Sequence, residues 1–100
     1  MRRLAELLEP VEAETPHGGW AVSYESLGPV WLRLETPRQR ERTEAGVTSI
    51  VEIARAGSRA DPRLIKGRAL RLDGGDWTIA LAAPDPDRPG WVDLSLEQRS

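Results

Sequence analysis

Residues 68–81 read RALRLDGGDWTIAL, and this stretch carries the clearest fold signal in the 100-residue chain. Leucines alternate with a polar residue up to Leu72, and apolar residues recur at every second position from Trp77. Between the two runs, Asp73-Gly74-Gly75-Asp76 supplies glycines that tolerate positive φ, as a tight hairpin turn requires. The stretch therefore predicts a β-hairpin whose strands are half-buried.

The same period-two alternation continues outward from this hairpin in both directions. It is broken by turn and loop residues at 27–29, 56–62 and 82–90, where glycine, proline and aspartate gather. The run at 47–55 has apolar residues on both faces, which is typical of a central or interface-lining strand. The remaining predicted strands cover residues 20–25, 30–35, 68–72, 77–81 and 91–96.

The N-terminal residues fit two patterns. Leu4, Leu7, Leu8 and Val11 suit one face of a helix, whereas residues 8–14 also alternate. We expect a short N-terminal helical turn and then an edge strand in which Pro10 is tolerated. The predicted fold class is all-β: one domain over residues 1–100, a small closed or partly open antiparallel β-barrel of about seven strands.

Composition excludes several classes of protein. A formal net charge of −2 with 30% charged residues gives no global electrostatic case for nucleic-acid binding. The absence of cysteine removes disulfides and thiol catalysis, and it fits a reducing compartment. No run approaches the ~20 apolar residues of a membrane span, and the N-terminus does not resemble a signal peptide. We expect a soluble chain with no membrane partner.

No residue constellation indicates an enzyme. His17 is the only histidine and lies in a predicted turn, so it has no second histidine with which to share a metal. The aspartates that flank Gly74-Gly75 and Pro86 are explained by turn formation. Nucleophile-elbow, P-loop and HExxH motifs are absent. We predict no catalytic residue, no cofactor and no metal site.

The four tryptophans are candidates for the core or for an interface. Trp31 and Arg33 alternate with Val30, Leu32 and Leu34, so if the apolar face points inward Trp31 points outward. An exposed tryptophan usually has a partner. The candidate interface residues are Trp31, Arg33 and Trp91.

Residues 37–46 show no apolar pattern between two good strands, and we expect a long loop there. A connection of this length is longer than most hairpin loops, which favours a functional role, although a plain solvated loop explains it equally well. The segment has a net charge of +1, so one copy would bind DNA poorly. A symmetric ring would bring several copies of this charge together. The candidate residues of this loop are Arg38, Gln39, Arg40, Glu41, Arg42, Thr43 and Glu44.

The order of these elements resembles the phage head-tail joining proteins, also called head-completion, head-closure or stopper proteins of long-tailed phages and gene transfer agents. The resemblance covers nearly the whole chain and rests on order and spacing rather than on a single motif. The matching pieces are Gly18-Gly19-Trp20, Val30-Trp31-Leu32, the Arg/Glu-rich loop, the strand near residues 47–53, Pro62 to Ile65, Gly67 to Gly75, Trp77-Thr78-Ile79 and the strand led by Trp91.

This resemblance implies a homo-oligomeric ring in the neck of a virion or phage-like particle that is assembled in the bacterial cytoplasm. Such a ring docks on the adaptor protein below the portal, closes the DNA exit and offers its far face to the tail terminator protein. Six copies are preferred and twelve remain open. The family also implies that residues 37–46 project into the channel toward double-stranded DNA.

The alternative to this connector function is a small OB-like single-stranded nucleic-acid-binding domain, in which exposed tryptophan stacks on bases.

Overall fold

The computed structural model describes residues 2–99, in which every regular element is a β-strand. This confirms the predicted all-β class. None of these residues belongs to a helix long and apolar enough to cross a membrane. The strands are β1 (Arg2–Glu14), β2 (Trp20–Leu34), β3 (Arg38–Glu44), β4 (Val47–Arg59), β5 (Ala69–Leu72), β6 (Gly75–Pro84) and β7 (Trp91–Arg99).

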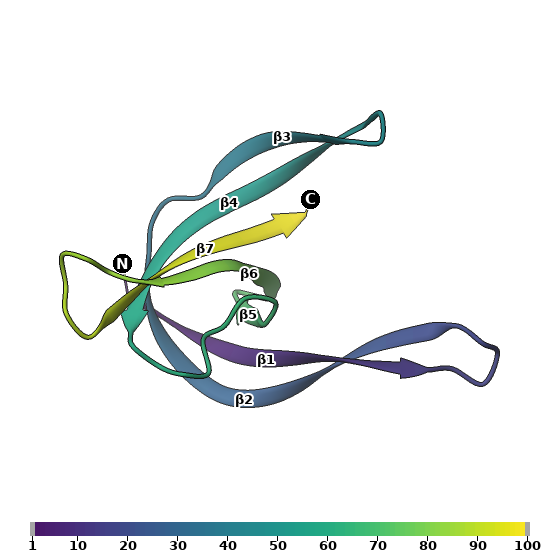
Figure 1. Cartoon of the computed structure of the whole chain (residues 1–100), viewed down its shortest axis with the longest axis horizontal. Helices are drawn as coiled ribbons and strands as arrows, with labels where there is room; N and C mark the ends of the chain where they lie inside the picture. The colour runs from purple at the N-terminus through teal and green to yellow at the C-terminus, as the bar shows by residue number, and fades with distance from the viewer. Residues whose placement is uncertain (1, 100) are drawn as a thin grey trace.

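The strands form one antiparallel sheet that joins onto itself. Their hydrogen-bonded order is β2-β1-β5-β6-β7-β4-β3, and an additional pairing between β2 and β4 closes a ring. Closure is uneven, because only two residue pairs join β2 to β4 whereas thirteen join β1 to β2. The sheet is therefore a partly open barrel, with β3 outside the ring on the edge of β4 (Figure 1).

Alternate residues of the ring strands fill its interior. Burying one leucine or isoleucine in such a core stabilises the fold by roughly 1.5–3 kcal/mol. Trp77 belongs to this core, so one of the four tryptophans is a packing residue. The core cluster comprises Ala5, Leu7, Val30, Leu32, Ala54, Ala56, Leu64, Leu70, Leu72, Trp77, Ile79, Leu94 and Leu96.

The hairpin predicted from residues 68–81 is confirmed as β5 and β6. Its two turn residues, Asp73 and Gly74, have φ of 50° and 78°. Positive φ at both central positions is the mark of a type I′ turn, whose twist matches that of the flanking strands.

Residues 27–29 form a bulge rather than the predicted turn, so two predicted strands are one continuous β2. Leu7 pairs with Gly28 and Leu8 with Ser26, which leaves Leu27 as the extra residue on β2. Gly28 has a φ of 103°, a conformation that glycine adopts without strain. The bulge bends the strand while its ladder with β1 continues on both sides.

The predicted N-terminal helical turn is wrong, because β1 begins at Arg2. Ala5 and Leu7 point into the core, and the backbone of β1 pairs with β2 on one side and β5 on the other. Leu8 is also buried, opposite the bulge of β2. Two consecutive buried leucines interrupt the period-two pattern, which is why the residues resemble a helix face. Pro10 lies beyond the contact with β5, on an edge that needs no donor.

The predicted loop at residues 37–46 is also wrong. Residues 38–44 are strand β3, which pairs along its length with β4. The connecting turn has positive φ at Ala45 and Gly46, 50° and 79°. Because β3 is an edge strand with both faces largely exposed, no burial pattern marks it in the sequence. Alternating charges on such an edge discourage pairing with other chains.

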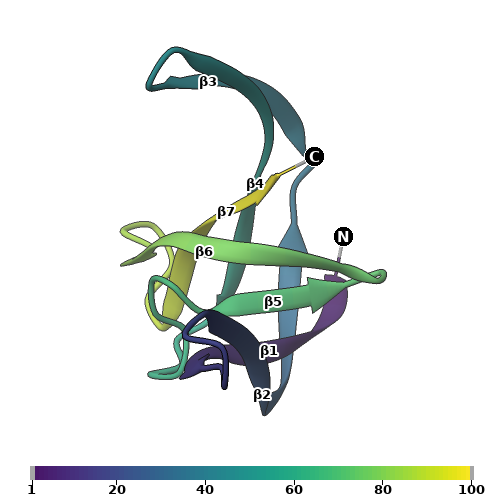
Figure 2. The same cartoon turned by 90° about the vertical axis from the view of Figure 1, so that its right-hand side faces the viewer.

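Two hairpins extend beyond the closed ring on the same side of the molecule (Figures 1 and 2). The β1–β2 hairpin is free of β5 after Leu8, and we call residues 9–25 the acidic arm. The β3–β4 hairpin is free of β7 beyond Val51. The chain measures 48 × 32 × 23 Å along its principal axes, elongated by these hairpins.

The core makes a direct stability prediction. Ile79 is completely buried, so Ile79→Ala should lower the free energy of unfolding by about 2–5 kcal/mol, measured by urea denaturation. Leu81 lies on the same strand with 59% of its surface exposed, and Leu81→Ala should change stability by less than about 0.5 kcal/mol. Equal losses at both positions would contradict the assigned facing of β6.

Candidate functional site

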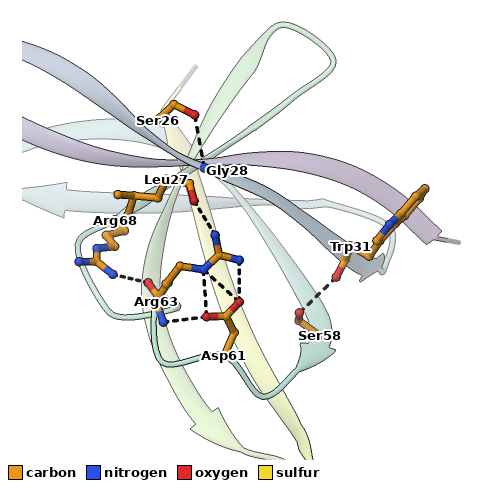
Figure 3. A network of polar contacts seen from close by, with 8 residues as sticks. All are labelled: Ser26, Leu27, Gly28, Trp31, Ser58, Asp61, Arg63 and Arg68. Atoms are coloured by element: carbon orange, nitrogen blue, oxygen red, sulfur yellow. Dashed lines mark hydrogen bonds and ion pairs between the residues drawn. The ribbon is translucent and has the colours of Figure 1, made fainter.

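The seam where β2 meets β4 is the least paired part of the barrel. Only Arg33 and Leu34 of β2 pair with β4, opposite Gly57 and Ala56. Beyond this point the buried Ser58 hydroxyl donates to the Trp31 carbonyl at 3.1 Å, replacing a ladder hydrogen bond (Figure 3). The strands then separate, and a cavity opens between them.

This cavity has a volume of about 390 Å³, and we call it the arginine pocket. Trp31, Arg33 and Trp91, the three residues predicted as interface candidates, all line it. Three further cations line its wall that were not predicted from the sequence: Arg2, Arg59 and Arg63. They come from the start of β1, the end of β4 and the following loop, so no sequence spacing connects them.

Trp31 points away from the core, as its alternation with Val30 and Leu32 predicts. The indole is 55% exposed while both neighbours are buried. The guanidinium of Arg2 lies over its ring, 5.1 Å from the centroid. Such a cation–π contact contributes about 0.5–1 kcal/mol at an exposed site, and it holds a positive charge beside the aromatic surface.

Three further arginines lie over the ring of Trp91. The guanidinium of Arg88 lies 4.1 Å from the ring centroid, that of Arg33 lies 5.7 Å away and that of Arg59 lies 5.9 Å away. Together with Arg2, these form a group of four cations stacked on two indoles. Within residues 2–99 none of the four has a carboxylate partner within ion-pair distance.

Arg63 fixes one wall of the pocket. Its guanidinium forms ion-paired hydrogen bonds with the Asp61 carboxylate at 2.7 and 3.1 Å, and donates to the Leu27 carbonyl at the bulge of β2 (Figure 3). The carbonyl of Arg63 in turn accepts from Arg68. Hydrogen bonding to Arg63 lowers the pKa of Asp61 below its usual value. This network ties the loop after β4 to the bulge.

The second candidate surface is β3. Its alternation places Arg38, Arg40 and Arg42 on one face, while Gln39, Glu41 and Thr43 lie on the other. Arg42 forms an ion pair with Glu97 of β7 at 2.7 Å, and this hydrogen bond raises the pKa of Arg42. Arg42 thus attaches the strand to the barrel. Arg38 and Arg40 are exposed and have no ion-pair partner in the described part of the chain.

The polar residues considered for catalysis or metal binding lie in turns and at strand ends. His17 lies in the exposed turn between β1 and β2. The Asp76 carboxylate pairs with Arg71 at 2.7 Å, and this hydrogen bond lowers the pKa of Asp76. Asp85 accepts from the backbone of Asp87 within the β6–β7 connection. Residues 2–99 contain no group of three side chains placed to hold a metal ion.

Comparison with known proteins identifies the fold. No family model matches the sequence, and no curated protein matches it. A chain in the solved virion of the native gene transfer agent (GTA) particle has a similar structure, with a TM-score of 0.72. The match covers 98% of this chain and 94% of that chain at 23% sequence identity. The two proteins therefore share a fold over nearly their whole lengths.

The Asp61–Arg63 pair predicts an acid-dependent loss of stability. Because the folded pKa of Asp61 is lowered, its stabilisation is complete above the unfolded value of about 3.9 and is lost as pH falls through the folded pKa. Asp61→Asn should lower the free energy of unfolding at pH 7 and flatten its decline below about pH 4, as measured by urea denaturation at several pH values. Arg63→Lys keeps the charge but loses the planar fork, and it should show much of the same loss. An unchanged acid profile in Asp61→Asn would contradict this role.

Proposed function

We propose that this chain is a structural head-tail connector, or stopper, of a phage-like particle. In this role it forms a ring in the particle neck between the portal-bound adaptor and the tail terminator, closes the DNA exit channel and provides the tail docking surface. The observation that carries the proposal is the fold shared with a chain of the GTA virion, which extends over 98% and 94% of the two chains.

The distribution of surface features supports a ring. The two free hairpins extend to one side of the molecule, whereas β1 and β7 begin at the other side (Figure 1). Arg2 and Trp91, at these two strand starts, line the arginine pocket. A closed ring needs two different lateral surfaces on each subunit, because its interface is heterologous. Trp31, Arg33 and Trp91 are the proposed interface residues on the pocket side.

The arginine face of β3 is the proposed DNA-facing surface. Arg42 is held by Glu97, so Arg38 and Arg40 are the cations available to phosphates. Two guanidinium groups bind DNA weakly, but six copies around a channel would present about twelve, and phosphate affinity grows with the number of contacts. A rigid two-stranded hairpin places these charges more firmly than a flexible loop would. Of the other residues predicted for this segment, Glu44 lies on the arginine face, whereas Gln39, Glu41 and Thr43 lie on the opposite face and make no proposed phosphate contact.

The experiment uses particles assembled with a variant chain. Arg38→Ala/Arg40→Ala should leave ring assembly intact but reduce the fraction of filled heads that retain DNA, because the channel loses its phosphate contacts. DNA retention is measured as nuclease-protected DNA per particle. Arg42 stays unchanged so that β3 remains attached to β7.

The matched control is Gln39→Ala/Glu41→Ala, which alters the opposite face of the same strand and should retain DNA normally. If particles with the arginine variant retain DNA as well as wild-type particles, β3 does not face the DNA. A chain that is absent from the neck, or a monomer that binds single-stranded DNA with strong salt dependence, would overturn the connector proposal and favour the OB-like alternative.

A further inference from the structure

Charge is divided unevenly along the chain. Between Arg3 and Arg33 the sequence contains five glutamates and no lysine or arginine. Four of these glutamates lie in the acidic arm, residues 9–25. Glu9 pairs with Arg68, whereas Glu12, Glu14 and Glu25 have no ion-pair partner in the chain from residue 2 to residue 99.

One face of the acidic arm combines carboxylates with exposed apolar side chains. Glu14 is paired with Trp20, Glu12 with Val22 and Pro10 with Tyr24, and cross-strand partners share a face. Trp20 is 70% exposed and Tyr24 is 48% exposed. Val22, between them on this face, is 54% exposed, and large exposed aromatic surfaces are typical of interaction sites.

The arginine pocket has the complementary composition. Its wall carries Arg2, Arg33 and Arg59 beside two indoles, and its remaining cation, Arg63, is neutralised by Asp61. A cavity of about 390 Å³ is large enough for an aromatic side chain. Carboxylates beside aromatic rings on the arm match guanidinium groups beside aromatic rings in the pocket.

The arm of one chain does not reach its own pocket. Leu4 of β1 pairs with Trp31, which lines the pocket, and Glu14 pairs with Trp20 near the arm's tip. Ten residues of strand, at about 3.3 Å each, separate these two positions by about 33 Å. The tip and the pocket thus lie toward opposite ends of the same hairpin, and the match requires two molecules.

We propose that the acidic arm of one copy docks in the arginine pocket of the next copy, with Glu12, Glu14 and Trp20 meeting Arg33, Arg59 and the two indoles. This inference rests on the proposed ring and names its lateral contact. Because donor and acceptor surfaces differ and lie on opposite sides, the contact is head-to-tail, as ring closure requires. Desolvated carboxylate–guanidinium pairs would set the register, and Trp20 would supply buried apolar area.

A charge-swap experiment on the purified full chain tests the contact. Glu12→Arg/Glu14→Arg and Arg33→Glu/Arg59→Glu should each weaken self-association at least tenfold in sedimentation velocity, because like charges then face each other. In an equal mixture, each reversed surface meets its complement on the other variant. Oligomers of wild-type size with 1:1 composition in native mass spectrometry should therefore return.

Two further variants keep the test independent of folding defects. Glu25→Arg reverses one carboxylate on the opposite face of the arm and should associate like wild type. Trp20→Ser alters a side chain too exposed to support the core, so it should weaken association while leaving the circular dichroism spectrum and unfolding curve unchanged.

The outcomes separate this contact from the connector role. A wild-type chain that stays monomeric at ~100 μM, single swaps that associate normally, or a mixture that fails to recover would each overturn the arm-in-pocket contact. Rings found in particle necks despite such a result would leave the connector proposal standing. Recovery of the mixed oligomer with no chain in the neck would support the contact and remove the connector role.

Discussion

The closure of the sheet between β2 and β4 is the constraint on which the rest of the structure depends. Two residue pairs and the Ser58 hydroxyl hold this seam, while every other junction of the ring is a longer ladder. The bulge at Leu27 shifts the register of β2 against β1, and Arg63 ties that bulge to the loop that follows β4. The short pairing of β2 with β4 closes the barrel around its core. Beyond this pairing the two strands separate, and the arginine pocket lies between them.

Negative and positive side chains lie on opposite sides of this barrel. Glu12, Glu14 and Glu25 of the first hairpin have no ion-pair partner in the described chain, and the strand ends on the opposite side carry arginines stacked on tryptophan. The net charge of −2 conceals this separation, because the two groups nearly cancel in the total. In the proposed arm-in-pocket contact these two surfaces would complement each other, which would direct assembly head-to-tail.

The sequence predicts the features that depend on burial and local turn chemistry. The alternation around Asp73-Gly74 identifies the β5–β6 hairpin, and the alternation at Val30-Trp31-Leu32 correctly turns Trp31 outward. Strand β3 is not predicted because an exposed edge strand has no burial pattern. The start of β1 is predicted as a helical turn because Leu7 and Leu8 are both buried, opposite the bulge of β2. The cations over the two indoles include Arg2, Arg59 and Arg88, which come from separate elements, so only the register of the closed sheet brings them together.

The most direct measurement is a cryo-electron microscopy reconstruction of the neck of the particle that contains this chain. The proposed role predicts a closed ring between adaptor and tail terminator, with the Arg38–Arg40 face of β3 lining the DNA channel. Each acidic arm should cross to the neighbouring subunit and bring Trp20 against Trp31 or Trp91. A chain located away from the neck, or a ring whose β3 hairpins point outward from the channel, would contradict it.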